Sequence, residues 1–143
     1  MAPGLTAPDP KELVLSEIRL SVPAAGDYVH VLRSVIASVA AKLNFSYDDI
    51  EDLRLAVDEA CAYLLSLRDD PTTLTLSITP SDGTVDVVAS VQGAGGAEQA
   101  PGAQANMMWH LLGALTDEAR FEEQSGQPGI RFTKTIAPAS AAR

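Results

Sequence analysis

Two consecutive stretches of helical periodicity limit the folds open to this chain more than any other feature. In the first, from about Asp27 to Leu43, apolar residues recur at three- and four-residue steps, which is typical of a helix with one buried face. These residues are Val29, Leu32, Val35, Ile36, Val39 and Leu43. Asn44 follows as a suitable C-terminal stop. The apolar face of this helix therefore needs another element to cover it.

The second helix is expected to begin at Ser46 and to end near Arg68. The residues from Ser46 to Asp49 read as a variant capping box, and acidic residues in the first turn favour the positive end of the helix dipole. The buried stripe of this helix is predicted to contain Ile50, Leu53, Val57, Ala60, Cys61 and Leu64. Cys61, the single cysteine, is expected to serve as a small core residue and excludes a disulfide within the chain.

Strands are predicted on both sides of the helical pair. Apolar residues alternate from Glu17 to Val22, so that Ile18, Leu20 and Val22 are expected to face inward. After the helices, alternation at residues 73–78 and 85–92 predicts two strands, and the sequence Pro80-Ser81-Asp82-Gly83 between them predicts a hairpin turn.

The remaining chain contains a loop, a helix and two strands. Glycines and other small residues predict a mobile loop from Gly93 to Gly102. A third helix is expected from about Gln104 to Leu115, with an inward face made by Met107, Met108, Leu111, Leu112 and Leu115. The last strands are expected at Ala119–Glu123 and Ile130–Ile136.

The predicted order is therefore β-α-α-β-β-α-β-β. This order indicates an α+β fold, a two-layer sandwich with helices on one face of a mainly antiparallel sheet. A chain of 143 residues fits one domain, expected at residues 12–136 between disordered tails at residues 1–11 and 137–143.

The net charge of the chain disfavours two classes of binding partner. The net charge of −9 argues against a nucleic-acid partner and against docking on an anionic membrane, because the field of the chain would repel both. No apolar stretch approaches the roughly 20 residues that span a bilayer, and no signal peptide is visible. We therefore expect a cytoplasmic protein.

A longer motif lies in the two helices. It consists of Tyr-Val-His-Val-Leu-Arg at residues 28–33 and Phe-Ser-Tyr-Asp-Asp-Ile-Glu-Asp-Leu-Arg-Leu-Ala-Val-Asp-Glu-Ala-Cys at residues 45–61. This motif resembles the first two helices of bacterial anti-sigma-factor serine/threonine kinases, members of the GHKL superfamily. The likeness covers roughly residues 16–136. It implies a histidine-kinase-like ATPase fold and, in that family, a nucleotide site beside the second helix.

The chain departs from the family at most nucleotide-binding positions. The family pattern implies a glutamate and an asparagine four residues apart; the glutamate matches Glu59, but Tyr63 stands where the asparagine would hold Mg²⁺. Val91 occupies the place of the adenine-reading aspartate, although Gln92 could substitute weakly if the alignment shifts by one, and Gly93 matches. The phosphate turn, expected at residues 103–108, contains no glycine. We therefore expect neither ATP nor Mg²⁺ as a cofactor, no metal site, and only a vestigial role for Glu59.

Because most nucleotide-binding residues are absent, a second hypothesis is that the old nucleotide site has become a different pocket. Its expected residues are Glu59, Tyr63, Gly93, Trp109 and His110, and its expected occupant is a small ligand that is not a nucleotide. Tyr63 would be either a wall of this pocket or a plug that fills the old site. Glu59 would otherwise be an ordinary helix carboxylate, Trp109 a core residue and His110 a structural residue.

A partner surface is predicted on the first helix. The resemblance implies that Arg33 corresponds to an arginine used against the sigma factor, and small or polar residues surround it. The predicted surface contains His30, Arg33, Ser34 and Ala37. The alternative is an ordinary solvated helix face.

Three functions remain open. The first is an anti-sigma factor of a bacterial stress response, which holds an alternative sigma factor by direct binding and is released by an anti-anti-sigma antagonist in a partner-switching scheme. The second is an active protein-serine kinase that phosphorylates the antagonist. The third is a small-molecule sensor with a partner other than a sigma factor. The resemblance also implies a homodimer through a sheet edge or the first strand.

Overall fold

A computed structural model of the chain describes residues 16–96 and 103–136. Eight helices and strands occur in this part of the chain: β1 (Ile18–Pro23), α2 (Gly26–Lys42), α3 (Tyr47–Ser66), β2 (Asp70–Ser81), β3 (Thr84–Ala94), α4 (Ala103–Leu115), β4 (Glu118–Phe121) and β5 (Gly129–Thr135). Their order confirms the predicted one. The two expected tails and residues 97–102 of the expected loop lie outside the described residues. Gly93 and Ala94, also expected in the loop, belong to β3 because they continue its pairing with β2.

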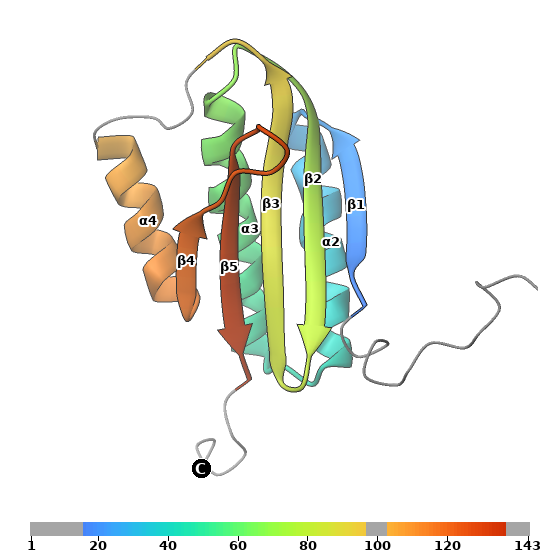
Figure 1. Cartoon of the computed structure of the whole chain (residues 1–143). Helices are drawn as coiled ribbons and strands as arrows, with labels where there is room; N and C mark the ends of the chain where they lie inside the picture. Colours follow the sequence, from blue (N-terminus) through green and yellow to red (C-terminus); the bar gives the residue numbers. More distant parts are fainter. Residues whose placement is uncertain (1–15, 97–102, 137–143) are drawn as a thin grey trace, which may run out of the picture.

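The strands form one sheet with the order β1-β2-β3-β5-β4. Every neighbouring pair is antiparallel. Helices α2 and α3 lie side by side across one face of this sheet, and α4 lies beside α3 near the edge made by β4 (Figure 1). The two-layer α+β sandwich expected from the sequence is therefore present.

The core lies between the helices and the sheet. Helix α2 contributes Leu32 and Ile36, and helix α3 contributes Leu53 and Leu64, all fully buried. The facing side chains come from alternate positions of three neighbouring strands: Leu74, Leu76, Ile78, Val85, Val87, Ala89, Val91, Ile130 and Phe132. Because the period of a strand is two, the remaining positions of these strands point away from the helices.

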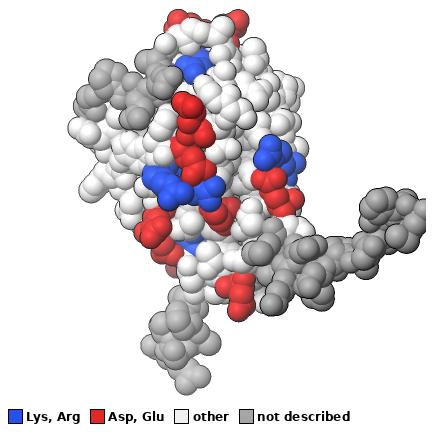
Figure 2. Space-filling model, in the orientation of Figure 1, with Lys and Arg blue, Asp and Glu red and all other residues white. Residues whose placement is uncertain are grey.

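The outer face of the sheet is polar. Arg131 of β5 forms ion pairs of 2.6 Å with Asp86 and 2.8 Å with Glu122. Figure 2 shows this face, on which acidic and basic side chains are interspersed rather than separated into patches of one sign. No layer of secondary structure among the described elements covers it (Figure 1). The alternation predicted for the strands therefore separates a buried apolar face from an exposed polar one.

Both predicted helix boundaries beside residue 45 have a local cause. Ser46 is the N-cap of α3, and its side-chain oxygen accepts a hydrogen bond of 3.1 Å from the backbone N–H of Asp49. Asn44 has a φ of +66°, in the left-handed region that often ends a helix. These two residues confirm the predicted break between the two helices.

Three further details of the sequence prediction were wrong. The hairpin turn is shorter than expected, because Pro80 and Ser81 still belong to β2 and pair with β3. Ile18 is 40% exposed, because it is the first residue of β1, which is an edge strand of the sheet. Met107 is 60% exposed, because α4 lies at the end of the helical layer with α3 on only one side.

None of the helices in the described residues is sufficiently long and apolar to cross a membrane.

Candidate functional site

A pocket of about 160 Å³ lies between α3 and α4. Helix α3 lines it with Glu59, Ala62 and Tyr63, and helix α4 lines it with Gln104, Met107 and Met108. Each set has the spacing i, i+3, i+4, which places the three side chains on one face of a helix. The two faces meet because α3 and α4 pack against each other.

Tyr63 forms the floor of this pocket. It is 2% exposed and belongs to the hydrophobic core cluster, and it also lines the pocket. The two alternatives for Tyr63, a wall or a plug, are thus not exclusive in this structure. The phenol occupies space that a smaller side chain would leave open.

Glu59 differs from its neighbour Asp58. The carboxylate of Asp58 accepts a hydrogen bond of 3.1 Å from Arg33 Nη1, which joins α3 to α2. Glu59 is half-buried at the pocket and, within the described residues, forms no ion pair and accepts no hydrogen bond through its side chain. One carboxylate in the pocket therefore has no protein partner among these residues.

Gly93 lies away from the pocket, in β3 opposite Pro71 of β2. A Cβ atom at Gly93 would come within 2.5 Å of the Asp70 carbonyl oxygen and 2.7 Å of the Pro71 Cα. Close approach of two backbones therefore explains this glycine. Val91 is fully buried in the core, and Gln92 is exposed on the opposite face of the sheet, so neither side chain reaches the pocket.

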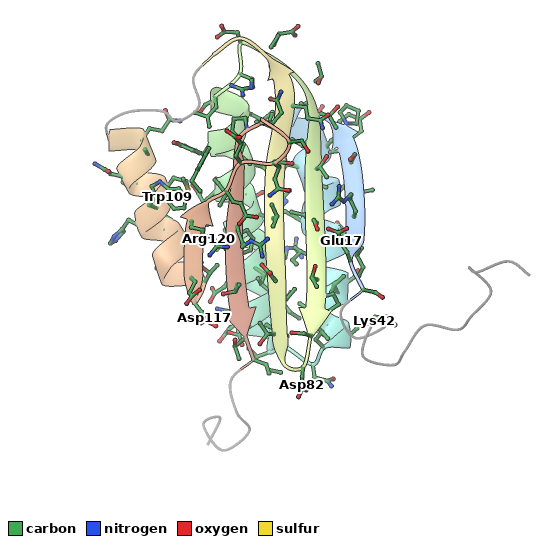
Figure 3. All side chains as sticks on the ribbon, viewed as in Figure 1. Glu17, Lys42, Asp82, Trp109, Asp117 and Arg120 are labelled. Carbon is green, nitrogen blue, oxygen red and sulfur yellow. The ribbon has the colours of Figure 1, made fainter. Side chains whose placement is uncertain are left out.

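Trp109 and His110 also do not line the pocket. Trp109 is half-buried against the hydrophobic core, on the side of α4 that faces the other elements (Figure 3). His110 is exposed. Of the five expected pocket residues, the structure brings together Glu59 and Tyr63.

The residues present do not fit a magnesium nucleotide. Tyr63 is buried where the resemblance implies a metal-holding amide, and a phenol is a poor Mg²⁺ ligand. The described lining has no lysine or arginine to pair with phosphates. The volume of about 160 Å³ is also below the roughly 300–1,000 Å³ typical of pockets for drug-sized ligands. No catalytic step through ATP follows from this geometry.

Several side chains of the expected partner surface on α2 are bonded to other residues of the chain. Arg33 contacts Asp58 through Nη1 and lies 2.9 Å from His30 Nδ1 through Nη2. The hydroxyl of Ser34 donates a hydrogen bond of 3.1 Å to the His30 carbonyl oxygen, while Ala37 is half-buried. Arg33 is therefore held in one orientation between two helices and remains only about a third exposed.

Sequence reasoning missed four of the pocket residues, namely Ala62, Gln104, Met107 and Met108. The spacing of these residues shows which of them share a helix face. It does not show that this face of α3 packs against this face of α4. It also missed Lys134, a buried lysine whose Nζ donates a hydrogen bond of 2.8 Å to the Leu115 carbonyl oxygen at the end of α4.

Shifted pKa values occur outside the pocket, among them those of Cys61 and Glu122. Burial, and to a lesser degree the charge of Asp58, raises the pKa of the Cys61 thiol to about 12, so this thiol stays protonated and unreactive. On the outer face, hydrogen bonds from Arg131 hold the pKa of Glu122 below its usual value. Neither group belongs to the pocket.

Comparisons with known proteins find relatives that share one name. Serine-protein kinase RsbW of Bacillus cereus (strain B4264) is 30% identical over 79 residues, which are 54% of this chain and 49% of that protein. The protein of the same name from Halalkalibacterium halodurans is 34% identical over 77 residues, 53% of this chain and 48% of its own length. The chain therefore spans about half the length of the curated relatives it matches. No protein-family model matches the sequence.

Comparison with solved structures gives the same fold over more of the chain. The crystal structure of the RsbU and RsbW domains of a Mycobacterium tuberculosis protein matches with a TM-score of 0.65 and 17% sequence identity. The match covers 87% of this chain and 34% of that one. In sequence over about half of its length, this chain is similar to proteins named serine-protein kinase RsbW, and most of it shares the fold of a structure that contains an RsbW domain.

Proposed function

We propose that this chain is an anti-sigma factor that acts by binding alone. It sequesters an alternative sigma factor in the cytoplasm, and an anti-anti-sigma antagonist releases the sigma factor by competing for an overlapping surface. The relationship to anti-sigma-factor serine kinases supports the kind of partner. The altered pocket supports the absence of a phosphorylation step.

The observation that carries this proposal is the burial of Tyr63. A side chain that is 2% exposed and packed into the core cannot move aside for a metal ion without opening a cavity. A tyrosine at this point therefore argues against binding of the magnesium that phosphoryl transfer needs to neutralise charge, which supports the proposal. Glu59 alone, with no cation beside it among the described lining residues, lacks the rest of that machinery.

The outer side of the two helices supports the binding role. Tyr28 and Val31 of α2 are 44% and 41% exposed, and Leu55 of α3 is 48% exposed. Large apolar side chains left in water on a folded domain often mark an interface. Arg33, held in place by Asp58, lies on the same helix as Tyr28 and Val31 and is suited to anchor a partner.

The direct test is binding of the purified chain to each alternative sigma factor of the source organism, followed by size-exclusion chromatography and calorimetry. We expect one sigma factor to form a stable complex, with or without Mg·ATP. Arg33→Glu is expected to weaken the complex at least tenfold. Arg19→Glu, which reverses a charge on β1 at the opposite face, is the matched control and is expected to leave it unchanged. No complex with any sigma factor would overturn the proposal.

A second candidate function is an active serine kinase of the antagonist, which the names of the relatives favour. It predicts transfer of the γ-phosphate from ATP to a serine of the antagonist, and loss of transfer in Glu59→Gln. We expect no transfer from the natural chain. Measurable transfer that depends on Glu59 would replace the first proposal with this one.

A further inference from the structure

The carboxylate of Glu59 is the starting point for a ligand of the pocket between α3 and α4. Its neighbour Asp58 is paired with Arg33, but Glu59 has no such partner among the described residues. A half-buried carboxylate is stabilised by an opposite charge within about 4–6 Å. A cation that enters the pocket would supply that charge.

The other walls of the pocket favour a cation with an apolar body. Tyr63 offers an aromatic ring, and Met107 and Met108 offer polarizable thioethers. Gln104 adds an uncharged amide. With no basic group in the described lining and a net charge of −9 on the chain, an anion would be repelled.

The size of the pocket limits the body of the ligand. An engineered protein cavity of about 150 Å³ holds benzene, and this pocket measures about 160 Å³. Met107, which is 60% exposed, stands at its edge and leaves apolar surface for a ligand to cover. The pocket therefore matches a molecule of about one ring, not a nucleotide.

We propose that the pocket between α3 and α4 binds a small organic cation, with one ammonium group on an apolar body about the size of a benzene ring. The ammonium pairs with Glu59, and the body lies between Tyr63 and the two methionines. Since this ligand would bridge two helices, it would also tie α4 to the helix that carries Asp58. This inference deepens the proposed function and rests on it only where the ligand is taken to act on a sigma-factor-binding protein.

Three probes with the same ring and different charge test the proposal. Benzylamine is a cation at pH 7, benzyl alcohol is neutral and benzoate is an anion. In calorimetric titration of the full chain we expect benzylamine to bind in the millimolar range, about tenfold more tightly than benzyl alcohol, with benzoate weakest. Equal or tighter binding of benzoate would overturn the proposal, as would no binding of benzylamine at about 10 mM.

Two variants locate the site. Glu59→Gln keeps the shape of the side chain and removes its charge, and it is expected to weaken benzylamine about tenfold. Glu123→Gln makes the same change at an exposed position outside the pocket and is expected to have no effect. Equal losses in both variants would mean that benzylamine responds only to the net charge of the chain, which would overturn a site at Glu59.

Met107→Lys is a second variant that does not depend on Glu59. The side chain is exposed, so the substitution should leave the fold intact, which circular dichroism checks. A cation at the edge of the pocket is expected to weaken benzylamine and to strengthen benzoate. An unchanged preference for benzylamine would contradict the assigned pocket.

The same protein samples separate this inference from the proposed function. A sigma factor that binds while benzylamine does not would overturn the ligand inference alone. Benzylamine that binds through Glu59 in a chain with no sigma-factor partner would overturn the proposed function alone.

Discussion

Arg33 and Asp58 join α2 to α3 through a contact of 3.1 Å between Nη1 and Oδ2. Both side chains are about a third exposed, so solvent screens part of their attraction. We expect Arg33→Ala or Asp58→Ala to lower the free energy of unfolding by about 1 kcal/mol, measured by urea denaturation. The double variant should lose less than the sum of the two single losses.

Arg54→Ala is the matched control for this pair. Arg54 also lies on α3, but its Nη1 is 3.9 Å from Glu51 Oε1, too long for a hydrogen bond. Its removal is expected to change the free energy of unfolding by less than about 0.5 kcal/mol. Strictly additive losses for Arg33 and Asp58 would show that the pair contributes nothing to stability.

Lys134 donates a hydrogen bond to the C-terminal end of α4. Its side chain is 11% exposed, and Nζ contacts the Leu115 carbonyl oxygen at 2.8 Å and carboxylate oxygens of Asp49 and Asp52 at 3.7 and 3.5 Å. Lys134→Met would leave the carbonyl and both carboxylates without this cation, at a cost of about 1–3 kcal/mol. Thermal unfolding followed by circular dichroism measures the loss.

Lys42→Met is the control for Lys134. Lys42 is exposed in the last turn of α2 and is expected to contribute only a few tenths of a kcal/mol through the helix dipole. If both lysine variants unfold at the same temperature, the contacts of Lys134 do not stabilise the fold.

Cys61 predicts how stability changes at high pH. Burial raises the pKa of its thiol from 9.0 to about 12, so between these values the folded chain keeps a proton that the unfolded chain releases. Stability from this group is complete below pH 9 and falls by about 1.4 kcal/mol per pH unit above it. Urea denaturation between pH 8 and pH 10.5 should therefore show a steeper loss in the natural chain than in Cys61→Ala, which lacks the titrating group. Parallel slopes would place the thiol in water.

Gly93 and Gly113 are expected to respond to alanine with opposite signs. At Gly93 a Cβ would lie 2.5 Å from the Asp70 carbonyl oxygen, so β2 and β3 would have to separate. At Gly113, inside α4, a Cβ meets nothing within 4 Å, and alanine favours a helix over glycine by about 1 kcal/mol. Urea denaturation should show Gly93→Ala less stable and Gly113→Ala more stable than the natural chain. A stable Gly93→Ala variant would contradict the close approach of the two strands.

The element order could be predicted from the sequence because its signals are local. The N-cap at Ser46 and the left-handed residue Asn44 act within a few positions of the chain, and both are present in the structure. Side-chain alternation likewise assigned the buried face of the hairpin that holds Leu76 and Val87. Such features depend on backbone preferences that each segment carries by itself.

The pocket and the ion pairs could be predicted only in part, because they depend on packing between distant segments. Glu59 and Tyr63 share a helix face and could be grouped from their spacing, whereas Met107 reaches them only through the packing of α4 on α3. Trp109 does not line the pocket although it follows Met108 in sequence, because adjacent residues of one helix point in different directions. The partner of Arg33, 25 residues away, carried no local signal.

The strand order has a consequence for synthesis of the chain. Strand β5 lies between β3 and β4 in the sheet, although it follows β4 in sequence. During translation, β4 leaves the ribosome before the strand to which it pairs, and α4 emerges before Lys134 can bond to its end. The nascent chain can thus form the hairpin of β2 and β3 early, but the final edge of the sheet must await the emergence of Gly129–Thr135 from the ribosome.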